Sequence, residues 1–321
     1  MAAVHQAPTG EIADLTGIRS ADLEALLEEE TRVWRQQLDW DFQPSAGLVR
    51  RYVDMRALSG YALRVDEKLV GYSYSVTDEH KGLICDLYVM EQFRSAENEN
   101  RLLAAVLEAL FETPYLRRVE SQLMLLSPMD QRLLPSARYL RTFERQFMTF
   151  DLSRLPSLKP KAPRSSVVFD QWTERRQDDT AQAIAAAYRG HIDSQINDQY
   201  RSPGGARRFL HNIIHYPGCG SFFAPASWVA IQRSTGCPCG LCLASLVAGD
   251  VGHITQICVT PPAQGAGLGY ELLRRSLASL AGAGCRKVSL TVTSSNTGAI
   301  RLYERMGFAS VRRFRAMVWE R

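Results

Sequence analysis

The chain has 321 residues, of which 45% are hydrophobic and 22% charged, and its formal net charge is +4 at pH 7. This composition is typical of a globular protein with enough residues for two domains. No uncharged apolar run of about 18 residues occurs, so we expect no membrane-spanning helix and no membrane partner. The first residues lack a basic segment followed by an apolar one, so we expect no secretory signal and predict a cytoplasmic protein.

The charge is divided unevenly along the chain. From Val167 onward, 17 Lys and Arg stand against 10 Asp and Glu, a balance of +7, whereas the remainder has 21 against 24, a balance of −3. A basic second half favours an anionic ligand in that half. We expect no nucleic acid as partner, because the arginines are scattered and no basic run is interleaved with aromatic residues.

Seven cysteines, an odd number, favour a reducing compartment over a set of disulfides. Cys237, Cys239 and Cys242 are close enough in sequence to hold a metal. A closed zinc site usually takes four ligands from two pairs, however, and no second pair follows. We therefore expect no metal and interpret the cluster as structural thiols, with a metal-binding interaction protein as the alternative.

A proline-rich segment divides the chain. Pro156, Pro160 and Pro163 fall within twelve residues together with Ser and Lys, a composition that cannot continue a helix or a central strand. The sequence therefore predicts a first domain over residues 1–152, a linker over residues 153–166 and a second domain over residues 167–321.

The second domain has a readable order of elements. Hydrophobic periodicity and turn residues predict helices over residues 178–193, 206–214, 267–280 and 296–306. They predict strands over residues 228–231, 241–247, 252–260, 287–293 and 311–319.

The first domain repeats much of this order. We expect helices over residues 23–38 and 99–112, and strands over residues 61–65, 69–76, 83–90, 118–125 and 147–152. The two halves therefore resemble diverged copies of one unit.

The strongest local signal is the glycine-rich loop at residues 264–269, Gln-Gly-Ala-Gly-Leu-Gly, which follows a predicted strand and opens a predicted helix. Glycines allow tight turns and a close approach of the backbone to a ligand. Backbone N–H groups at a helix N-terminus favour phosphate or pyrophosphate. The loop is neither a dinucleotide fingerprint nor a P-loop, because the residues that would complete those motifs do not surround it.

This loop resembles the pyrophosphate loop of the GNAT (Gcn5-related) N-acetyltransferases, Gln/Arg-x-x-Gly-x-Gly/Ala, which matches at Gln264, Gly267 and Gly269. Residues 296–308, from Asn296 through Tyr303 to Phe308, resemble a second element of that family, Asn-x-x-Ala-x-x-Leu-Tyr-x-x-x-Gly-Phe. The two elements occur in the right order around a predicted strand, and the resemblance covers residues 167–321.

The resemblance implies an α/β (α+β) fold of two GNAT-type domains, each a mixed, mostly antiparallel splayed sheet flanked by helices. The tandem layout and length are also similar to the mycothiol synthase family. The resemblance further implies acetyl-coenzyme A as the co-substrate. Its expected binding residues are the strand before the loop, the loop itself and the start of the last helix, namely Ile257, Cys258, Val259, Gln264, Gly265, Ala266, Gly267, Leu268, Gly269, Tyr270 and Asn296.

The catalytic roles that the resemblance implies are fewer. Tyr303 corresponds to the family's general acid, which protonates the departing thiolate. Family members often place a Glu on the strand about eleven positions before the loop's Gln, and His253 holds that position here. A histidine can accept the amine proton near neutral pH, so His253 is the candidate base, with a packing role as the alternative. Cys258 is not expected to act as a nucleophile, because the family transfers the acyl group directly.

The acceptor is expected against the polar, aromatic segment 188–201, where Asp193 and Asp198 could bind an ammonium group and Tyr200 could cover it. In the first half, residues 94–100 hold the loop position without any glycine, and Glu97 and Glu99 would repel a pyrophosphate. We therefore predict a degenerate first domain and an active second one. The expected function is acetyl transfer from acetyl-coenzyme A to a primary amine, and the alternative is a non-catalytic acyl-coenzyme A-binding regulatory module.

Overall fold

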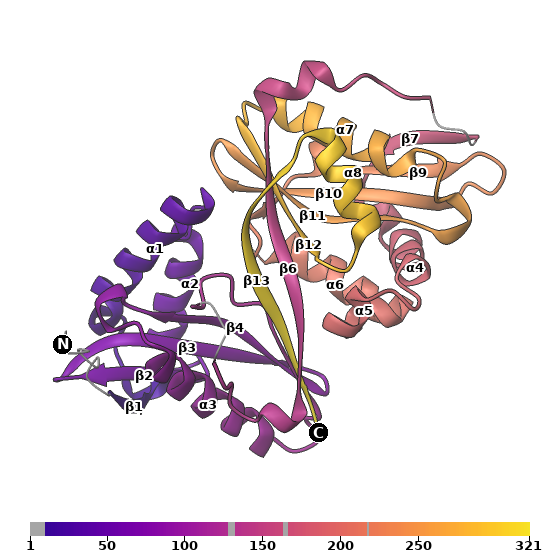
Figure 1. Cartoon of the computed structure of the whole chain (residues 1–321). Coiled ribbons are helices and arrows are strands. Elements are labelled where there is room, and N and C mark those ends of the chain that lie inside the picture. Colours follow the sequence, from indigo (N-terminus) through magenta and orange to yellow (C-terminus); the bar gives the residue numbers. More distant parts are fainter. Residues whose placement is uncertain (1–9, 128–131, 163–165, 217) are drawn as a thin grey trace. The chain divides into compact units, whose positions relative to one another are not determined.

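The computed structural model describes residues 10–127, 132–162, 166–216 and 218–321. The chain forms two compact units. The first contains residues 10–143 together with Phe314–Arg321, and the second contains Glu144–Arg313 (Figure 1). Each unit is a sheet with helices on both faces, so the predicted α/β class is confirmed.

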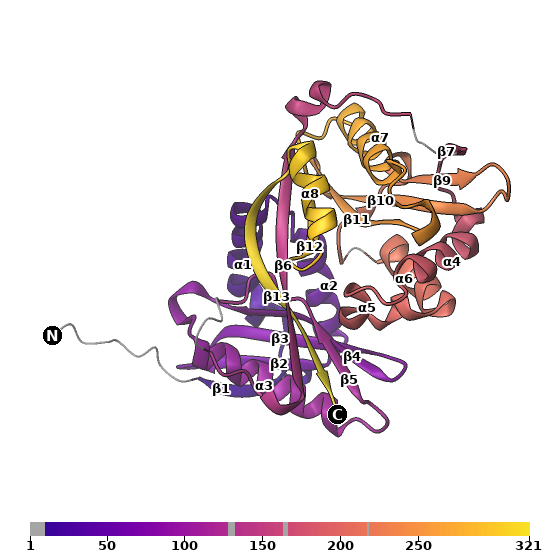
Figure 2. The ribbon, with the colours of Figure 1, turned by 45° about the vertical axis from the view of Figure 1, so that its right-hand side comes forward.

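The first unit is built on the strands β1 (Glu11–Asp14), β2 (Gly60–Val65), β3 (Lys68–Asp78), β4 (Lys81–Val89), β5 (Arg118–Ser121) and the end of β13 (Ala309–Glu320). They lie in the order β1-β2-β3-β4-β5-β13, and the β4–β5 pair is parallel while its neighbours are antiparallel. Helices α1 (Glu24–Leu38) and α2 (Gln43–Asp54) lie on one face and α3 (Ala96–Glu112) lies on the other (Figures 1 and 2).

Helix α2 was not predicted from the sequence, although a signal for it exists. Its buried residues Ala46, Val49 and Val53 recur at helical spacing, and Pro44 occupies its first turn, where proline is tolerated. Gly47 and the charged residues interrupt this short apolar stripe, so the segment has the composition of a loop and its helical periodicity is weak. Helix α1 has a longer apolar stripe, and it was predicted to within one residue at its start.

The first unit buries two carboxyl groups side by side. Glu30 of α1 is fully buried, and Tyr72 Oη donates to its Oε2 at 2.8 Å. Asp86 of β4 lies against the same tyrosine, with Tyr72 Oη 3.3 Å from Asp86 Oδ2. Burial raises the pKa of Glu30 well above its usual value, and the charge of Asp86 raises it further. Burial likewise raises the pKa of Asp86 to about 6. The pair therefore holds at least one proton near neutral pH.

We expect the first unit to lose stability as pH rises. A carboxyl whose pKa is raised in the folded state binds its proton more tightly there, so its stabilising contribution is complete below the unfolded pKa near 4 and is lost as pH passes the folded value. For Asp86, whose pKa rises from 3.8 to about 6, the loss is about 3 kcal/mol between pH 4 and pH 7. Urea unfolding of the full chain at a series of pH values measures it.

Asp86→Asn should flatten that profile, because the asparagine cannot ionise. The exposed Glu112→Gln in the same unit is the matched control and should leave the profile unchanged. A stability that stays level or increases from pH 4 to pH 7 in the unmodified protein would contradict this account of the buried pair.

The second unit contains β6 (Leu140–Asp151, from residue 144), β7 (Val167–Gln171), β8 (Ser221–Phe222), β9 (Trp228–Gln232), β10 (Pro238–Ala248), β11 (Val251–Val259), β12 (Lys287–Thr293) and the start of β13. The strand order is β6-β12-β11-β10-β9-β7, with β8 paired to β10, and β11–β12 is the parallel pair. Its helices are α4 (Gln177–Ala187), α5 (Asp193–Ile196), α6 (Pro203–His215), α7 (Leu268–Gly282) and α8 (Thr297–Met306).

The helices of the second unit cover both faces of its sheet. Helices α4, α5 and α6 lie on one face and α7 lies on the other (Figures 1 and 2). Two apolar cores result. One joins α7 and α8 to the sheet through Leu272, Leu277 and Met306, and the other joins α4 and α6 through Ile184 and Leu210.

The division of the chain differs from the predicted boundaries. Residues 145–151 of β6 pair with β12, so the end of the predicted first domain lies in the second sheet. Conversely, Met317–Glu320 of β13 pair with β5, so the end of the predicted second domain lies in the first sheet. Each half thus gives its last strand to the sheet of the other unit. A strand's hydrogen-bonding partner depends on tertiary pairing, and hydrophobic alternation alone does not specify it.

The predicted linker is not a free connection. Its first part, Leu152–Ser157, is a 3₁₀ helix, and Leu155 and Leu158 pack against the core that contains α7. The backbone carbonyl of Lys159 accepts a hydrogen bond from Tyr270 Oη at 2.9 Å. Residues 163–165 lie outside the described part of the chain. The segment therefore forms part of the second unit's surface next to α7.

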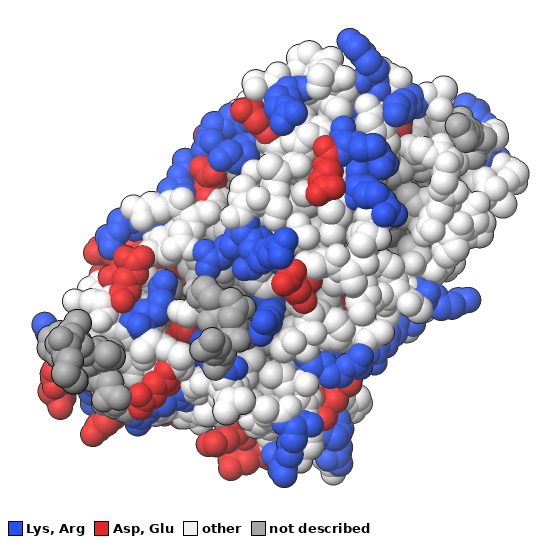
Figure 3. All heavy atoms as spheres, in the orientation of Figure 1, with Lys and Arg blue, Asp and Glu red and all other residues white. Residues whose placement is uncertain are grey.

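The cysteine cluster lies in the β9–β10 hairpin, with Cys237 in the turn and Cys239 and Cys242 on β10. Cys239 and Cys242 are buried in the apolar core, and Cys237 is exposed. Within the described residues, no three His, Cys, Asp or Glu side chains are grouped as a metal site would require. Helices long and apolar enough to cross a membrane are likewise not found in the part of the chain that the structure describes. On the face in Figure 3, Lys and Arg side chains are dispersed among acidic ones.

Candidate coenzyme and acyl-transfer site

The second unit contains a pocket of about 1020 Å³. It is formed by the segment after β6, the end of α4, the end of β11, the loop into α7, and α8. Its lining residues are Ser157, Leu158, Lys159, Lys161, Ala187, Tyr188, His191, Ile257, Cys258, Val259, Ala263, Gln264, Gly265, Gly267, Leu268, Gly269, Tyr270, Asn296, Gly298, Ala299, Leu302, Tyr303 and Arg305. Of the predicted coenzyme-binding and catalytic residues, only Ala266 and His253 are missing from this lining.

One wall of the pocket is an unpaired strand edge. Strand β11 pairs with β12 only from Val251 to Ile254, whereas its pairing with β10 continues to Val259. A register shift at Thr255 marks the position where β11 leaves its parallel neighbour. The sheet therefore splays, and the end of β11 presents backbone groups that lack a partner strand on that side. Such an edge can hydrogen-bond an extended, amide-containing ligand.

The loop before α7 forms an open helix N-terminus. Gly265 and Gly267 have φ of +76° and +84°, which glycine adopts without strain. No side chain caps α7, unlike α6 and α8, whose first N–H groups bond to Ser202 and Asn296. A Cβ built on Gly265 or Gly267 would meet no heavy atom within 4 Å. The N–H groups of the first turn are thus free to bind an anion in open space.

The charge of the lining suits an anion as well. Lys159, Lys161 and Arg305 line the pocket, and the lining contains no carboxylate. Lys161 Nζ lies 4.5 Å from the centre of the Tyr270 ring, which holds it beside the loop. The two lysines come from the predicted linker, so sequence reasoning missed them. The feature that could have identified them is their position next to leucines, Leu155 and Leu158, which pack against the core.

Tyr303 reaches the pocket from α8. Asn296 caps this helix through its Oδ1, which accepts from the Ala299 N–H at 3.2 Å. The Tyr303 ring packs against Phe308 at 5.9 Å between centroids, and the side chain is almost completely buried. Burial raises the pKa of Tyr303, and the charges of Cys242 and Asp193 raise it further. The phenol therefore keeps its proton at neutral pH and can donate it.

Cys258 also lies in the lining, but as a neutral thiol. Burial, with the nearby Cys242, raises its pKa above the ordinary range. A thiol is a nucleophile only as the thiolate, so this environment does not activate Cys258.

His253 lies away from the pocket. It belongs to the part of β11 that is still paired on both sides, opposite Ser245 and Ser289, and its Nδ1 lies 2.9 Å from Ser289 Oγ. Burial, assisted by the charge of Arg145, lowers the pKa of His253 to about 3. The ring is thus neutral and resists taking a proton at neutral pH. The sequence spacing placed His253 on β11. It could not show that only the end of this strand, Ile257 to Val259, lines the pocket.

His191 is the histidine that lines the pocket. Its Nε2 lies 3.2 Å from Nδ2 of Asn296, which also lines the pocket. Its Nδ1 accepts a hydrogen bond from the Asp193 backbone N–H at 3.2 Å and lies 3.9 Å from Asp193 Oδ2. Asp193 in turn accepts a hydrogen bond from Thr293 Oγ1. The sequence pointed to segment 188–201 as the acceptor side and to Asp193, but it did not single out His191.

The other predicted acceptor residues are placed near this group. Tyr200 stacks on Tyr188 with ring centroids 4.5 Å apart, and Tyr188 lines the pocket. Asp198 lies in the short 3₁₀ helix Asp198–Arg201 and is not part of the lining.

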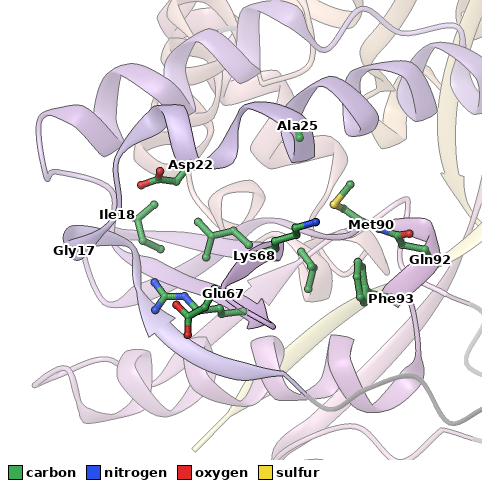
Figure 4. A pocket seen from close by; sticks show the side chains of 12 residues that line it. Gly17, Ile18, Asp22, Ala25, Glu67, Lys68, Met90, Gln92 and Phe93 are labelled. Carbon is green, nitrogen blue, oxygen red and sulfur yellow. The ribbon is translucent and has the colours of Figure 1, made fainter.

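The first unit has a different pocket at the corresponding end of its sheet. It measures about 600 Å³ and is lined by Asp22, Arg64, Glu67 and Lys68 among apolar residues. Figure 4 shows the Lys68 side chain extending toward Met90 and Gln92. Charges of both signs thus surround this pocket, whereas those of the second unit's pocket are all positive.

The helix that follows β4 is closed to anions. Ser95 caps α3 by accepting from the Asn98 N–H at 3.1 Å. Glu99 in its first turn is buried and ion-paired with Arg132. In the described residues between β5 and β6, no α-helix corresponds to α8.

Residues 171–308 match the family described as "Acetyltransferase (GNAT) family". This part of the second unit is therefore similar to the GNAT family. The chain is 48% identical over 59 residues to a mycothiol acetyltransferase from Mycobacteroides abscessus, covering 18% of this chain and 20% of that one. It is 37% identical over 62 residues to an N-alpha-acetyltransferase from Arabidopsis thaliana, covering 19% and 33%. The alignments thus span a third or less of these relatives.

Solved structures match nearly the whole chain. A GCN5-related N-acetyltransferase from Sphaerobacter thermophilus has a TM-score of 0.67 at 20% identity, covering 97% of this chain and 95% of that one. A tandem GNAT protein from the clavulanic acid biosynthesis pathway has a TM-score of 0.63 at 15% identity, covering 97% and 98%. These likenesses confirm the predicted tandem GNAT fold.

Proposed function

We propose that this protein is an acetyl-coenzyme A-dependent N-acetyltransferase whose reaction takes place in the second unit. The observation that carries the proposal is the uncapped N-terminus of α7, with Gly265 and Gly267 facing open space, in one pocket with the protonated phenol of Tyr303. The match of residues 171–308 to the GNAT family and the names of the relatives, both acetyltransferases, support it.

In this proposal the pyrophosphate of the coenzyme binds the N–H groups of residues 264–269, where the helix dipole favours negative charge. Lys159, Lys161 and Arg305 supply positive charge around it. The pantetheine arm lies along the unpaired edge of β11, where the N–H groups of Ile257, Cys258 and Val259 are candidates for the amide and acetyl oxygens. The site needs no metal for these contacts.

Transfer then requires two proton movements. The neutral amine attacks the thioester carbonyl, a C–N bond forms and the C–S bond breaks. We assign the amine proton to the imidazole of His191, in place of the predicted His253, and the proton for the departing sulfur to the phenol of Tyr303. The Asp193 carboxylate, 3.9 Å from Nδ1, stabilises the imidazolium that forms.

The first unit is proposed to bind no coenzyme. Its helix α3 is capped by Ser95, and its first turn contains the ion-paired Glu99. Both features occupy the position where the second unit has bare N–H groups.

The function is tested by measuring coenzyme A release chromatographically with a broad panel of primary amines. We expect release that depends on the amine, together with one acetyl-coenzyme A bound per chain. The two named relatives differ in acceptor, so the panel should include small-molecule amines and peptide N-termini. Tight binding without turnover on any amine would instead favour a non-catalytic acyl-coenzyme A-binding module.

The two histidines make opposite predictions for the reaction rate. His191→Gln should lower kcat/KM by about 100-fold, the usual contribution of a general base. His253→Asn should leave kcat/KM nearly unchanged, because the ring lies outside the pocket lining and burial lowers the pKa of His253 to about 3. A loss of rate confined to His253→Asn would reverse the assignment.

A further inference from the structure

Arg145 is a buried cation without a counter-charge. It lies on β6, its Cα faces that of Thr293 on β12, and its residue surface is 9% exposed. Nη2 donates to Thr291 Oγ1 at 3.1 Å. Nε is buried and has no hydrogen-bond partner, and among the described residues no carboxylate lies within 4.0 Å of this side chain.

Two buried arginines of the first unit have the carboxylate partner that Arg145 lacks. In the first unit, Arg118 pairs with Glu120 and Arg132 pairs with Glu99, and all four side chains are almost fully buried. A buried guanidinium without an anion carries a large desolvation cost, so buried charges in proteins are usually paired. Arg145 has only a neutral hydroxyl as partner. An anion from outside the chain would supply the partner that the described residues do not provide.

Arg145 is close to the groups that carry the proposed reaction. Its cross-strand neighbour Thr293 donates to Asp193 Oδ1. Asp193 contacts His191, and His191 lines the pocket. The positive charge of Arg145 also lowers the pKa values of Tyr303, Tyr200 and His253, opposing the larger effect of burial on the two tyrosines. Its electrostatic field thus reaches both the proton donor and the acceptor wall.

We propose that the acceptor is a small amine that also carries a carboxylate, and that Arg145 binds this carboxylate while Asp193 and His191 face the amine. The inference rests on the proposed function and names its substrate class. The planar guanidinium of arginine suits a carboxylate because two of its N–H groups can bind the two oxygens in parallel. The unpartnered Nε and the adjacent Nη2 form such an edge.

The short separation between Arg145 and Asp193 limits the length of the acceptor. Arg145 and Thr293 are cross-strand partners, and Thr293 contacts Asp193, so the anionic and cationic subsites are separated by a single strand pair. Only an amine whose carboxylate is a few bonds away from the nitrogen can reach both. Short amino acids fit this description, whereas the side-chain amine of a protein lysine does not.

The test compares amines that differ only in the carboxylate. Short α- and ω-amino acids, such as glycine, β-alanine and γ-aminobutyrate, are assayed beside their primary amides, with coenzyme A release as the readout. We expect kcat/KM at least tenfold higher for the carboxylates. Arg145→Met should remove this preference by lowering the rate on carboxylates while leaving that on amides unchanged. Arg145→Lys, which keeps the charge without the fork, should retain part of the preference.

The matched control is Arg141→Met, which removes an exposed arginine from the same strand and should leave both rates unchanged. Acetyl-coenzyme A affinity and melting temperature of each variant show that the fold is intact. Aminomethylphosphonate as a better acceptor than glycine would overturn the carboxylate assignment in favour of a phosphate-like group.

Other outcomes also overturn the proposal. Equal rates on acids and amides, or an equal loss on both in Arg145→Met, would make Arg145 a structural residue. Acetyl-coenzyme A binding without acetylation of any carboxylate-bearing amine would overturn the proposed substrate class and leave the coenzyme site standing. A failure of the unmodified protein to bind acetyl-coenzyme A would instead overturn the proposed function, and this inference with it.

Discussion

Gly267→Glu is expected to lower the affinity for acetyl-coenzyme A by well over tenfold, more than about 1.4 kcal/mol. The substitution puts a carboxylate at the N-terminus of α7, where a Cβ meets no heavy atom within 4 Å and where we place the pyrophosphate. Repulsion between the two anions and loss of space act in the same direction. Calorimetry on the full chain measures both the affinity and the number of sites.

Gly267→Ala is the matched control for backbone strain. Any residue with a Cβ is strained at the φ of +84° found here, so both variants share that cost and only the glutamate adds charge and bulk. We expect Gly267→Ala to bind more weakly than the unmodified protein and more tightly than Gly267→Glu. Two sites per chain, or binding indifferent to both substitutions, would show that the coenzyme is misplaced in our account.

Tyr303→Phe is expected to lower kcat by about 100-fold while leaving acetyl-coenzyme A affinity within about twofold. The ring that packs against Phe308 is retained, and only the hydroxyl that would protonate the departing sulfur is lost. Pre-steady-state assays of coenzyme A release separate this chemical step from product release.

The exposed Tyr216→Phe, in the same unit but outside the lining, is the control and should have no effect on either quantity. An unchanged kcat in Tyr303→Phe would show that water supplies the proton and that Tyr303 serves only in packing.

The two units share their sheet geometry and differ in the helix N-terminus that follows it. In each, the parallel pair ends early and a register shift marks the splay, opposite Tyr74 and Ser75 in β3 and opposite Leu243 and Ala244 in β10. The helix that follows is capped and carries a paired carboxylate in the first unit, and it is bare in the second. The first unit forms the same strand pairing without a glycine-rich loop, because the pairing depends on the residues of the strands.

Local features of the site could be predicted because they depend on neighbours in sequence. The strand–loop–helix of residues 257–270 and helix α8 lie where periodicity, glycines and motif spacing placed them, and all but one of the predicted coenzyme residues line one pocket. Strand β12 has the predicted bounds Lys287–Thr293. Hydrophobic periodicity and turn chemistry act over a few residues, so a single sequence contains them.

What required the tertiary structure is the set of contacts between distant segments. His191 and Asn296, 105 positions apart, meet in the lining, and Asp193 meets Thr293 across 100 positions. Lys159 and Lys161 join the pocket because Tyr270 and the apolar core hold the supposed linker against α7.

By itself, the sequence determined that this protein has a GNAT-type loop and tyrosine helix in its second half, since each motif is a local arrangement of glycines, caps and apolar spacing. Only the tertiary structure decided which histidine lines the pocket, which lysines join it, and that the last strands of the two halves are exchanged. It also decided that Arg145 is buried with no carboxylate beside it among the residues described. These depend on where β11 splays and on which strands pair, and such choices minimise the free energy of the whole chain rather than of any one segment.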